Sequence, residues 1–189
     1  MTRVRLVVLC VLGIFLLAIG TLYWWISSHG FSARETPSSF EAFLARNARR
    51  LATPANARAM SNPVSRTELS IAEARDHFAD HCAICHGNDG SGRTQINTGL
   101  YPPAPDMRER GTQQLSDGEL FYIIRNGVRF TGMPGWGGED EENWKLVLFI
   151  RHLPTLTQKE LELMKEINNL ETEQTEDGHG QRPVAPDRN

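Results

Sequence analysis

The chain opens with one long apolar segment and then alternates short amphipathic segments with polar loops. Residues 6–26 contain no charged residue, and at about 1.5 Å rise per residue they would span a hydrocarbon core of roughly 30 Å. Further along, apolar residues recur at the three- and four-residue intervals of a helix, and little of the chain alternates as a strand does. The pattern predicts an all-α protein with an N-terminal transmembrane helix.

The flanks of the apolar segment predict its orientation. Arg3 and Arg5 precede it, which places the N-terminus in the cytoplasm, and the aromatic residues 23–25 suit the far headgroup level. The alternative is a cleaved signal peptide, since residues 18–20 (Ala-Ile-Gly) resemble a small-x-small cleavage site. Cleavage there would leave an apolar start, TLYWWIS, for no evident reason, so a retained anchor is preferred. In both cases the chain after residue 30 is exported.

Capping boxes, in which a Ser or Thr is followed three residues later by Glu, mark several helix starts. They begin at Ser38, Ser116 and Thr157. With the apolar periodicity they predict helices over residues 38–51, 68–81, 117–126, 142–153 and 158–169. Residues 87–114 and 128–138 are rich in Gly and Pro and are expected to form ordered loops. The helix at 38–51 either packs on its own domain or lies on anionic headgroups.

Charge is unevenly distributed along the chain. Residues 1–66 hold eight Lys and Arg against two Asp and Glu, a net charge of +6. Residues 67–155 hold eight against thirteen, a net charge of −5, and residues 156–189 hold four against eight, a net charge of −4. No segment has the dense basic face that nucleic-acid phosphates require. Nucleic acid is therefore excluded as a partner, whereas the acidic segments suit a partner with a basic patch.

The motif CAICH at residues 82–86 carries the main chemical signal. A zinc site would need four ligands, but the third cysteine of the chain, Cys10, lies in the apolar segment. A thioredoxin-like dithiol would need a βαβ context, and the surroundings here are helical. Covalent haem attachment uses all three residues: Cys82 and Cys85 form thioethers with two vinyl groups, and His86 binds the iron.

A second axial ligand must come from the opposite side of the haem, where methionine or histidine is usual. Met133 is the best candidate, because it lies in the loop TGMPGW with Gly132, Pro134 and Gly135 beside it. Such a loop can bring a sulfur close to iron without an intervening helix. Met107 is the second choice.

The order of these motifs resembles the class I cytochrome c family over residues 68–154. The resemblance rests on CAICHG (82–87), YPPAPDM (101–107), TGMPGW (131–136) and WKLVLFIRHLP (144–154). It implies a class I cytochrome c fold around one covalent haem c, with the first and last core helices crossing near Phe78 and the face of Trp144, Val147 and Leu148. It also implies that the carbonyl of Pro102 or Pro103 accepts the Nδ1–H bond of His86. Further candidates for the haem pocket are Tyr101 and Trp136.

More narrowly, the chain resembles a membrane-anchored bacterial monohaem cytochrome. The expected organisation is a cytoplasmic N-terminus (1–5), an anchor (6–26), a spacer with a short amphipathic helix (27–66), a cytochrome c domain (67–155), an accessory helix (156–170) and a disordered polar tail (171–189). The expected location is the inner membrane, with one pass and a periplasmic haem domain.

With both axial positions filled, the iron has no open position for a substrate. The expected function is therefore outer-sphere transfer of single electrons in a periplasmic respiratory or oxidoreductase chain, not enzymatic catalysis. The partners would be membrane-bound or periplasmic redox proteins, together with the lipid bilayer. Two alternatives remain open: a haem-bearing subunit of a larger membrane oxidoreductase, and a haem enzyme or ligand sensor in which Met133 is displaceable.

Overall fold

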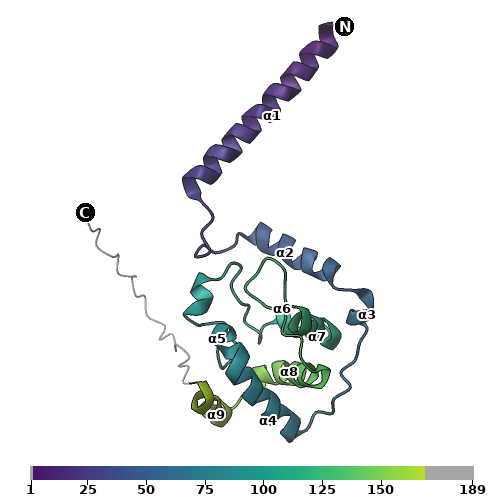
Figure 1. The fold of residues 1–189 in the computed structure, drawn as a ribbon, viewed down its shortest axis with the longest axis vertical. Coiled ribbons are helices and arrows are strands. Elements are labelled where there is room, and N and C mark those ends of the chain that lie inside the picture. Colours follow the sequence, from purple (N-terminus) through teal and green to yellow (C-terminus); the bar gives the residue numbers. More distant parts are fainter. Residues whose placement is uncertain (1, 169–189) are drawn as a thin grey trace, which may run out of the picture. The chain divides into compact units, whose positions relative to one another are not determined.

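In a computed structural model of the protein, residues 2–168 are described, and they form helices joined by loops with no strand among them (Figure 1). The chain divides into two units, residues 1–35 and residues 36–189. The first unit contains α1 (Thr2–His29). Residues 3–29 of α1 contain an 18-residue window with a mean hydropathy of 2.7, so the helix is long and apolar enough to cross a membrane. A signal sequence at this position would meet the same criterion, so an anchor and a leader are both compatible with α1.

The second unit is a bundle of short helices. Its elements are α2 (Ser39–Ala52), α3 (Ala55–Arg58), α4 (Glu68–His77), a π-helical turn (Phe78–Cys82), α5 (Ala83–His86), a 3₁₀ turn (Ile96–Gly99), α6 (Arg110–Gln113), α7 (Asp117–Asn126), α8 (Asp140–His152), a second 3₁₀ turn (Leu153–Thr155) and α9 (Gln158–Asn168). All five predicted helices are confirmed, with ends shifted by a few residues. The accessory helix predicted at 156–170 is observed as α9, whereas the tail predicted at 171–189 lies outside the described residues.

Side-chain caps explain where the helices begin. The Ser38 and Ser116 hydroxyls accept the N–H groups of Glu41 and Glu119, and each Glu carboxylate accepts the N–H of its capping serine. The same reciprocal pair links Thr157 and Glu160 at the start of α9. Because these caps satisfy N–H groups that a helix leaves unpaired, the predicted starts are confirmed.

The core forms where α4 and the π-helical turn pack against α8. Phe78 and Phe149 are 1% and 0% exposed, and their ring centroids lie 5.1 Å apart. The predicted α8 face is buried as expected, but Trp144 stacks on Phe121 of α7, with centroids 4.1 Å apart. Phe149 is thus the residue of α8 that meets Phe78, which the sequence pattern did not indicate.

The predicted spacer at 27–66 is divided between the two units, since residues 36–66 belong to the second. The segment after α2 packs on α7, where Gly118 has no side chain and allows a close approach: a Cβ atom there would lie 1.9 Å from the Ala57 carbonyl oxygen. The Ser116 hydroxyl donates to the Arg58 carbonyl at 3.0 Å, and the Asn62 amide donates to the Trp144 carbonyl at 2.9 Å. Residues 53–62 are therefore fastened to the helical core.

The accessory helix α9 also belongs to the second unit. Met164 is fully buried, and the Asn168 amide donates to the Ala79 carbonyl in the π-helical turn at 2.7 Å. The same amide donates to the side-chain oxygen of Asn88 at 2.6 Å. Through these contacts α9 supports the segment that carries the CAICH motif.

Candidate functional site

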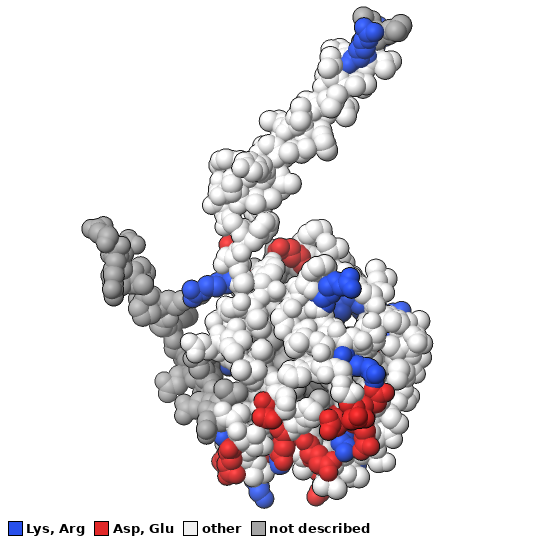
Figure 2. Space-filling view, in the orientation of Figure 1, with Lys and Arg blue, Asp and Glu red and all other residues white. Residues whose placement is uncertain are grey.

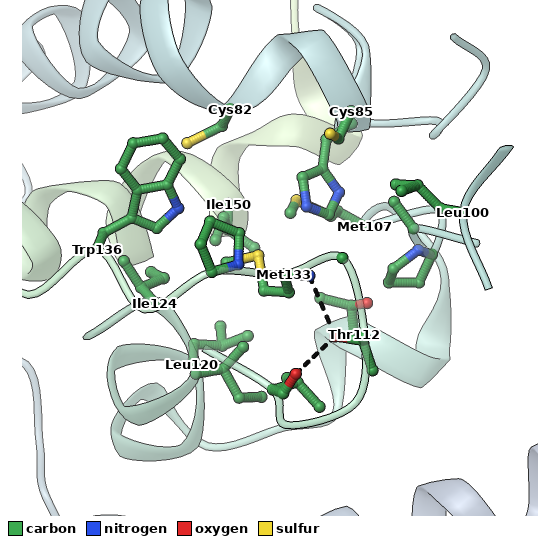
Figure 3. A pocket seen from close by; sticks show the side chains of 18 of the residues that line it. Cys82, Cys85, Leu100, Met107, Thr112, Leu120, Ile124, Met133, Trp136 and Ile150 are labelled. Carbon is green, nitrogen blue, oxygen red and sulfur yellow. Dashed lines mark hydrogen bonds between the residues drawn. The ribbon is translucent and has the colours of Figure 1, made fainter. Parts of the chain in front are cut away.

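The CAICH motif begins in the π-helical turn and ends with α5. Cys82 and Cys85 lie three residues apart, which places them on the same side of a helical turn, and His86 is the last residue of α5. Gly87, with a φ of 73°, then ends the helix. Neither Cys82 nor Cys85 forms a disulfide. Figure 3 shows both cysteine side chains on one side of a cavity, into which the Met133 side chain extends from the facing loop.

This cavity has a volume of about 360 Å³ and walls that are mostly apolar. Side chains from both predicted loops, from the π-helical turn and from the helices α2, α5, α6, α7 and α8 contribute to it. The lining residues are Arg49, Phe78, His81, Cys82, Ile84, Cys85, His86, Leu100, Pro102, Pro103, Ala104, Pro105, Met107, Thr112, Leu115, Leu120, Ile123, Ile124, Val128, Thr131, Gly132, Met133, Pro134, Trp136, Leu146 and Ile150.

The two thiols are not tuned for dithiol redox chemistry. Burial raises the pKa of Cys82 to about 12, with a further contribution from Cys85, and burial also raises the pKa of Cys85. Redox-active cysteines instead have lowered pKa values, because the thiolate is the nucleophile. The environment therefore opposes the dithiol alternative and suits thiols that become thioethers.

His86 is held as a neutral imidazole. Burial lowers its pKa to about 4, and the backbone of Pro105 acts in the opposite direction. Its Nδ1 is buried and has no hydrogen-bond partner among the described residues. A neutral imidazole is the form that binds a metal ion.

The acceptor expected from the sequence is the carbonyl of Pro102 or Pro103, and the structure records no hydrogen bond from the His86 Nδ1 to either of them. Both prolines line the cavity, but the backbone of Pro105 is the one that acts on His86. The stretch PPAP offers three prolines, and spacing alone does not indicate which carbonyl turns toward the imidazole.

The loop after CAICH is fastened to the proline-rich stretch on the His86 side of the cavity. The Gly92 N–H donates to the His86 carbonyl at 2.7 Å. The Asn97 amide donates to the carbonyls of Gly92 and Ala104, and its oxygen accepts the Ala104 N–H. The Met107 N–H donates to the Gly90 carbonyl at 2.8 Å.

Arg108 adds ion pairs that join the loop after CAICH to the proline-rich stretch. Its guanidinium bridges Asp89, at 3.0 Å, and Asp106, at 2.6 Å. These hydrogen bonds and ion pairs hold residues 87–108 together next to His86.

Met133 lies on a separate loop that is fastened to the end of α7. The Val128 N–H donates to the Met133 carbonyl at 3.1 Å, and the Met133 N–H donates to the Thr131 hydroxyl at 3.1 Å. The Trp136 N–H donates to the Ile124 carbonyl of α7 at 3.2 Å. These bonds hold Met133 at the cavity independently of the segment that supports His86.

Both methionine candidates line the cavity, so its walls alone do not choose between them. Met107 is 8% exposed and belongs to the segment fastened behind His86. Met133 belongs to the facing loop. Because the two axial ligands must approach the iron from opposite sides, the facing loop favours Met133.

The remaining predicted pocket residues divide into two groups. Pro102, Pro103 and Trp136 line the cavity, whereas Tyr101 is not among the lining residues. The Tyr101 hydroxyl donates to the Glu41 carboxylate of α2 at 2.9 Å. Trp136 is 41% exposed and makes an edge contact with His81, with ring centroids 5.5 Å apart.

Sequence reasoning missed several lining residues, among them Leu100, Pro105 and Arg49. Leu100 also packs against the methionine loop, because a Cβ atom on Gly132 would lie 2.8 Å from the Leu100 side chain. Arg49 is separated from the CAICH motif by more than thirty residues and lies in a cluster of three arginines that looks like a solvated helix face. No local signal identifies it as part of a site.

A comparison with known families identifies the domain that contains the CAICH motif. Residues 70–150 match the model of a family described as cytochrome c oxidase, cbb3-type, subunit III. A comparison with curated proteins found no match. The matched domain implies a covalently bound haem c. The cavity fits that group, since two thiols, a neutral imidazole and a thioether meet within apolar walls.

Proposed function

We propose that residues 70–150, which form a class I c-type cytochrome domain, pass single electrons between redox proteins on the periplasmic side of the bacterial inner membrane. One observation carries the proposal: Cys82, Cys85 and His86 line an apolar cavity that Met133 enters from an independent loop. This donor set is the one that holds a six-coordinate haem.

Each of these residues has a distinct role in the proposal. Cys82 and Cys85 hold the haem through thioether bonds, and His86 and Met133 serve as axial ligands. When bound, haem c supplies a one-electron ferric–ferrous couple. The apolar walls would exclude water, which favours the less charged reduced state. If His86 and Met133 both bind the iron, the chain would leave it no open position for a substrate, which suits electron transfer without a bound substrate.

The acidic surface over α4 and α8 favours docking of a redox partner that has a basic patch. Figure 2 shows Asp and Glu gathered over the part of the unit where Figure 1 places α4 and α8. On this surface Lys145 lies 2.8 Å from Glu73 and 3.0 Å from Glu141. A net charge of −5 over residues 67–155 would increase the rate of encounter with a basic partner.

Membrane attachment follows from α1, which we propose is retained as an anchor. A tether raises the effective concentration of the haem domain near membrane partners. Membrane fractions washed with high salt would retain the haem-stained chain. Haem stain found only in the soluble fraction, on a chain that starts near Thr21, would establish cleavage.

A haem-bearing subunit of a larger oxidoreductase is the second candidate function. The matched family is described as an oxidase subunit, and the packing of α9 on the domain provides additional surface for stable assembly. Purification of the tagged full-length chain in mild detergent distinguishes the two. Stoichiometric copurification of other redox subunits would favour the subunit, and isolation of the chain alone would favour the carrier.

The central experiment tests covalent attachment and axial ligation together. Acidic organic solvent should leave the haem on the denatured chain, and extraction of the haem would refute the thioether assignment. Met133→Ala should lower the reduction potential, remove the methionine–iron charge-transfer band and allow the reduced protein to bind carbon monoxide. An unchanged spectrum would move the ligand role to another residue, with Met107→Ala tested next. Carbon monoxide binding by the unmodified protein would instead favour a ligand sensor.

A further inference from the structure

The segment that precedes the matched domain contributes a charged side chain to the cavity. Arg49 lies on α2, outside residues 70–150, yet it lines the same cavity as Cys82, Cys85 and Met133. Among the lining residues it is the one Lys or Arg. A cation at an otherwise apolar wall indicates that an anion belongs beside it.

No carboxylate of the described residues forms an ion pair with Arg49. Within residues 2–168 the Arg49 guanidinium makes no hydrogen bond or ion pair, although it is half-buried. Burial lowers its pKa, the Glu119 carboxylate acts in the opposite direction, and Arg46 and Arg50 lower it further. Glu119 is committed elsewhere, because its carboxylate accepts the Ser116 N–H at 2.8 Å in the cap of α7. A partly desolvated guanidinium that has no hydrogen bond or ion pair among residues 2–168 is what a ligand carboxylate would match.

The weak packing of α2 supports the same conclusion. None of its residues is buried, and apolar side chains such as Phe40 and Leu51 are 72% and 83% exposed. A polar contact, from the Tyr101 hydroxyl to Glu41 near the start of the helix, connects α2 to the proline-rich stretch. Arg49 lies near the other end of α2 and extends to the cavity. Hydrophobic burial therefore does not explain why this helix lies where it does.

We propose that Arg49 binds a propionate carboxylate of the haem, so that α2 completes the cofactor site from outside the matched domain. The inference rests on the proposed function, because haem c supplies the two propionate groups. The planar guanidinium can donate two parallel hydrogen bonds to a carboxylate. The fixed positive charge stabilises the reduced haem, which carries less positive charge, and the ion pair holds α2 against the domain.

The test compares single charge removals within one helix, made in the full-length holoprotein. Arg49→Gln is the variant, and Arg46→Gln and Arg50→Gln are matched controls, because all three lose one positive charge but residues 46 and 50 are exposed and do not line the cavity. The readouts are the reduction potential, the propionate carboxylate bands in redox-difference infrared spectra, and hydrogen exchange of the α2 amides.

Arg49→Gln should lower the potential, shift the carboxylate bands and speed amide exchange in α2. The two controls should leave the carboxylate bands and the exchange rates at their unmodified values. Equal behaviour of Arg49→Gln and Arg46→Gln in the infrared spectrum would overturn the proposal. If Arg49→Gln accumulates too little holoprotein, Arg49→Lys replaces it in the test, because an ammonium group cannot donate in the same planar geometry. Shifted propionate carboxylate bands in Arg49→Lys would support the proposal, and unshifted bands would refute it.

Failure of this inference differs from failure of the proposed function. If acidic organic solvent extracts the haem from the unmodified protein, the covalent site is wrong whatever Arg49 does. If the haem stays attached and the Arg49 variants match their controls, only the role of Arg49 is refuted.

Discussion

Gly127 controls how closely the methionine loop approaches the end of α7, and its replacement by alanine should displace that loop. Gly127 follows the last residue of α7 with a φ of 69°. A Cβ atom there would lie 2.5 Å from Gly135 N and Pro134 C, and 2.7 Å from the Met133 carbonyl oxygen. All three are backbone atoms, so no side-chain rotation can relieve the contact.

The size of the displacement follows from these distances. Ordinary contacts of a Cβ atom begin at 3.4 Å, so the closest contact is about 0.9 Å too short and the loop must move by a comparable distance. The hydrogen bond from Val128 N–H to the Met133 carbonyl, 3.1 Å long, would lengthen or break. The Gly127 backbone, with a φ of 69° and a ψ of −168°, lies in a region essentially restricted to glycine and adds a cost of about 1–3 kcal/mol for an L-residue. We expect a weaker methionine–iron bond, a lower reduction potential and reduced stability.

Gly137→Ala provides the matched control for the assay. Gly137 also has a positive φ, 58°, but a Cβ atom there would have nothing within 4 Å. Gly137→Ala therefore places a Cβ atom at a residue with a positive φ but creates no close contact with the methionine loop. Both variants are measured by the methionine–iron charge-transfer band, the reduction potential and thermal unfolding of the holoprotein. Gly137→Ala should lower the stability but leave the charge-transfer band and the reduction potential unchanged. If both variants keep the band and the potential of the unmodified protein, the reasoning that Gly127 positions Met133 is refuted.

Three further predictions concern the support of the site and the core. Asn97→Ala leaves the backbone groups of residues 92 and 104 without their partners and should reduce stability by about 1–3 kcal/mol in denaturant unfolding; a change below 0.5 kcal/mol would contradict it. Hydrogen bonds from Arg108 lower the pKa of the Asp106 carboxyl, although burial opposes this shift. The ionised carboxylate therefore stabilises the folded protein above the unfolded pKa of about 3.9, and this stabilisation is lost as the pH falls through the lower folded pKa. Asp106→Asn should therefore destabilise the protein more at pH 7 than at pH 2, and an equal effect at both would refute the linkage. Phe149→Ala should cost about 3–5 kcal/mol, because the side chain is fully buried against Phe78; a loss under 1 kcal/mol would show that the crossing is not the core.

Local signals in the sequence determined the helices and the attachment motif. The capping boxes at Ser38, Ser116 and Thr157 appear in the structure, because their hydrogen bonds connect residues only three apart and need no tertiary partner. The spacing of Cys82, Cys85 and His86 is likewise local, since one helical turn brings them together. For the same reason Met133, in its Gly- and Pro-rich loop, could be proposed as a ligand.

Only the tertiary structure decided which residues from separate segments meet at the cavity. The backbone of Pro105 is the one that raises the pKa of His86, and the path of this loop depends on hydrogen bonds from Asn97 and on the ion pairs of Arg108. Arg49 reaches the cavity because the segment after α2, residues 53–62, is hydrogen-bonded to α7 and α8. These hydrogen bonds join residues that are far apart in the sequence. Such contacts depend on the three-dimensional path of the chain, which hydrophobic periodicity and capping residues do not specify.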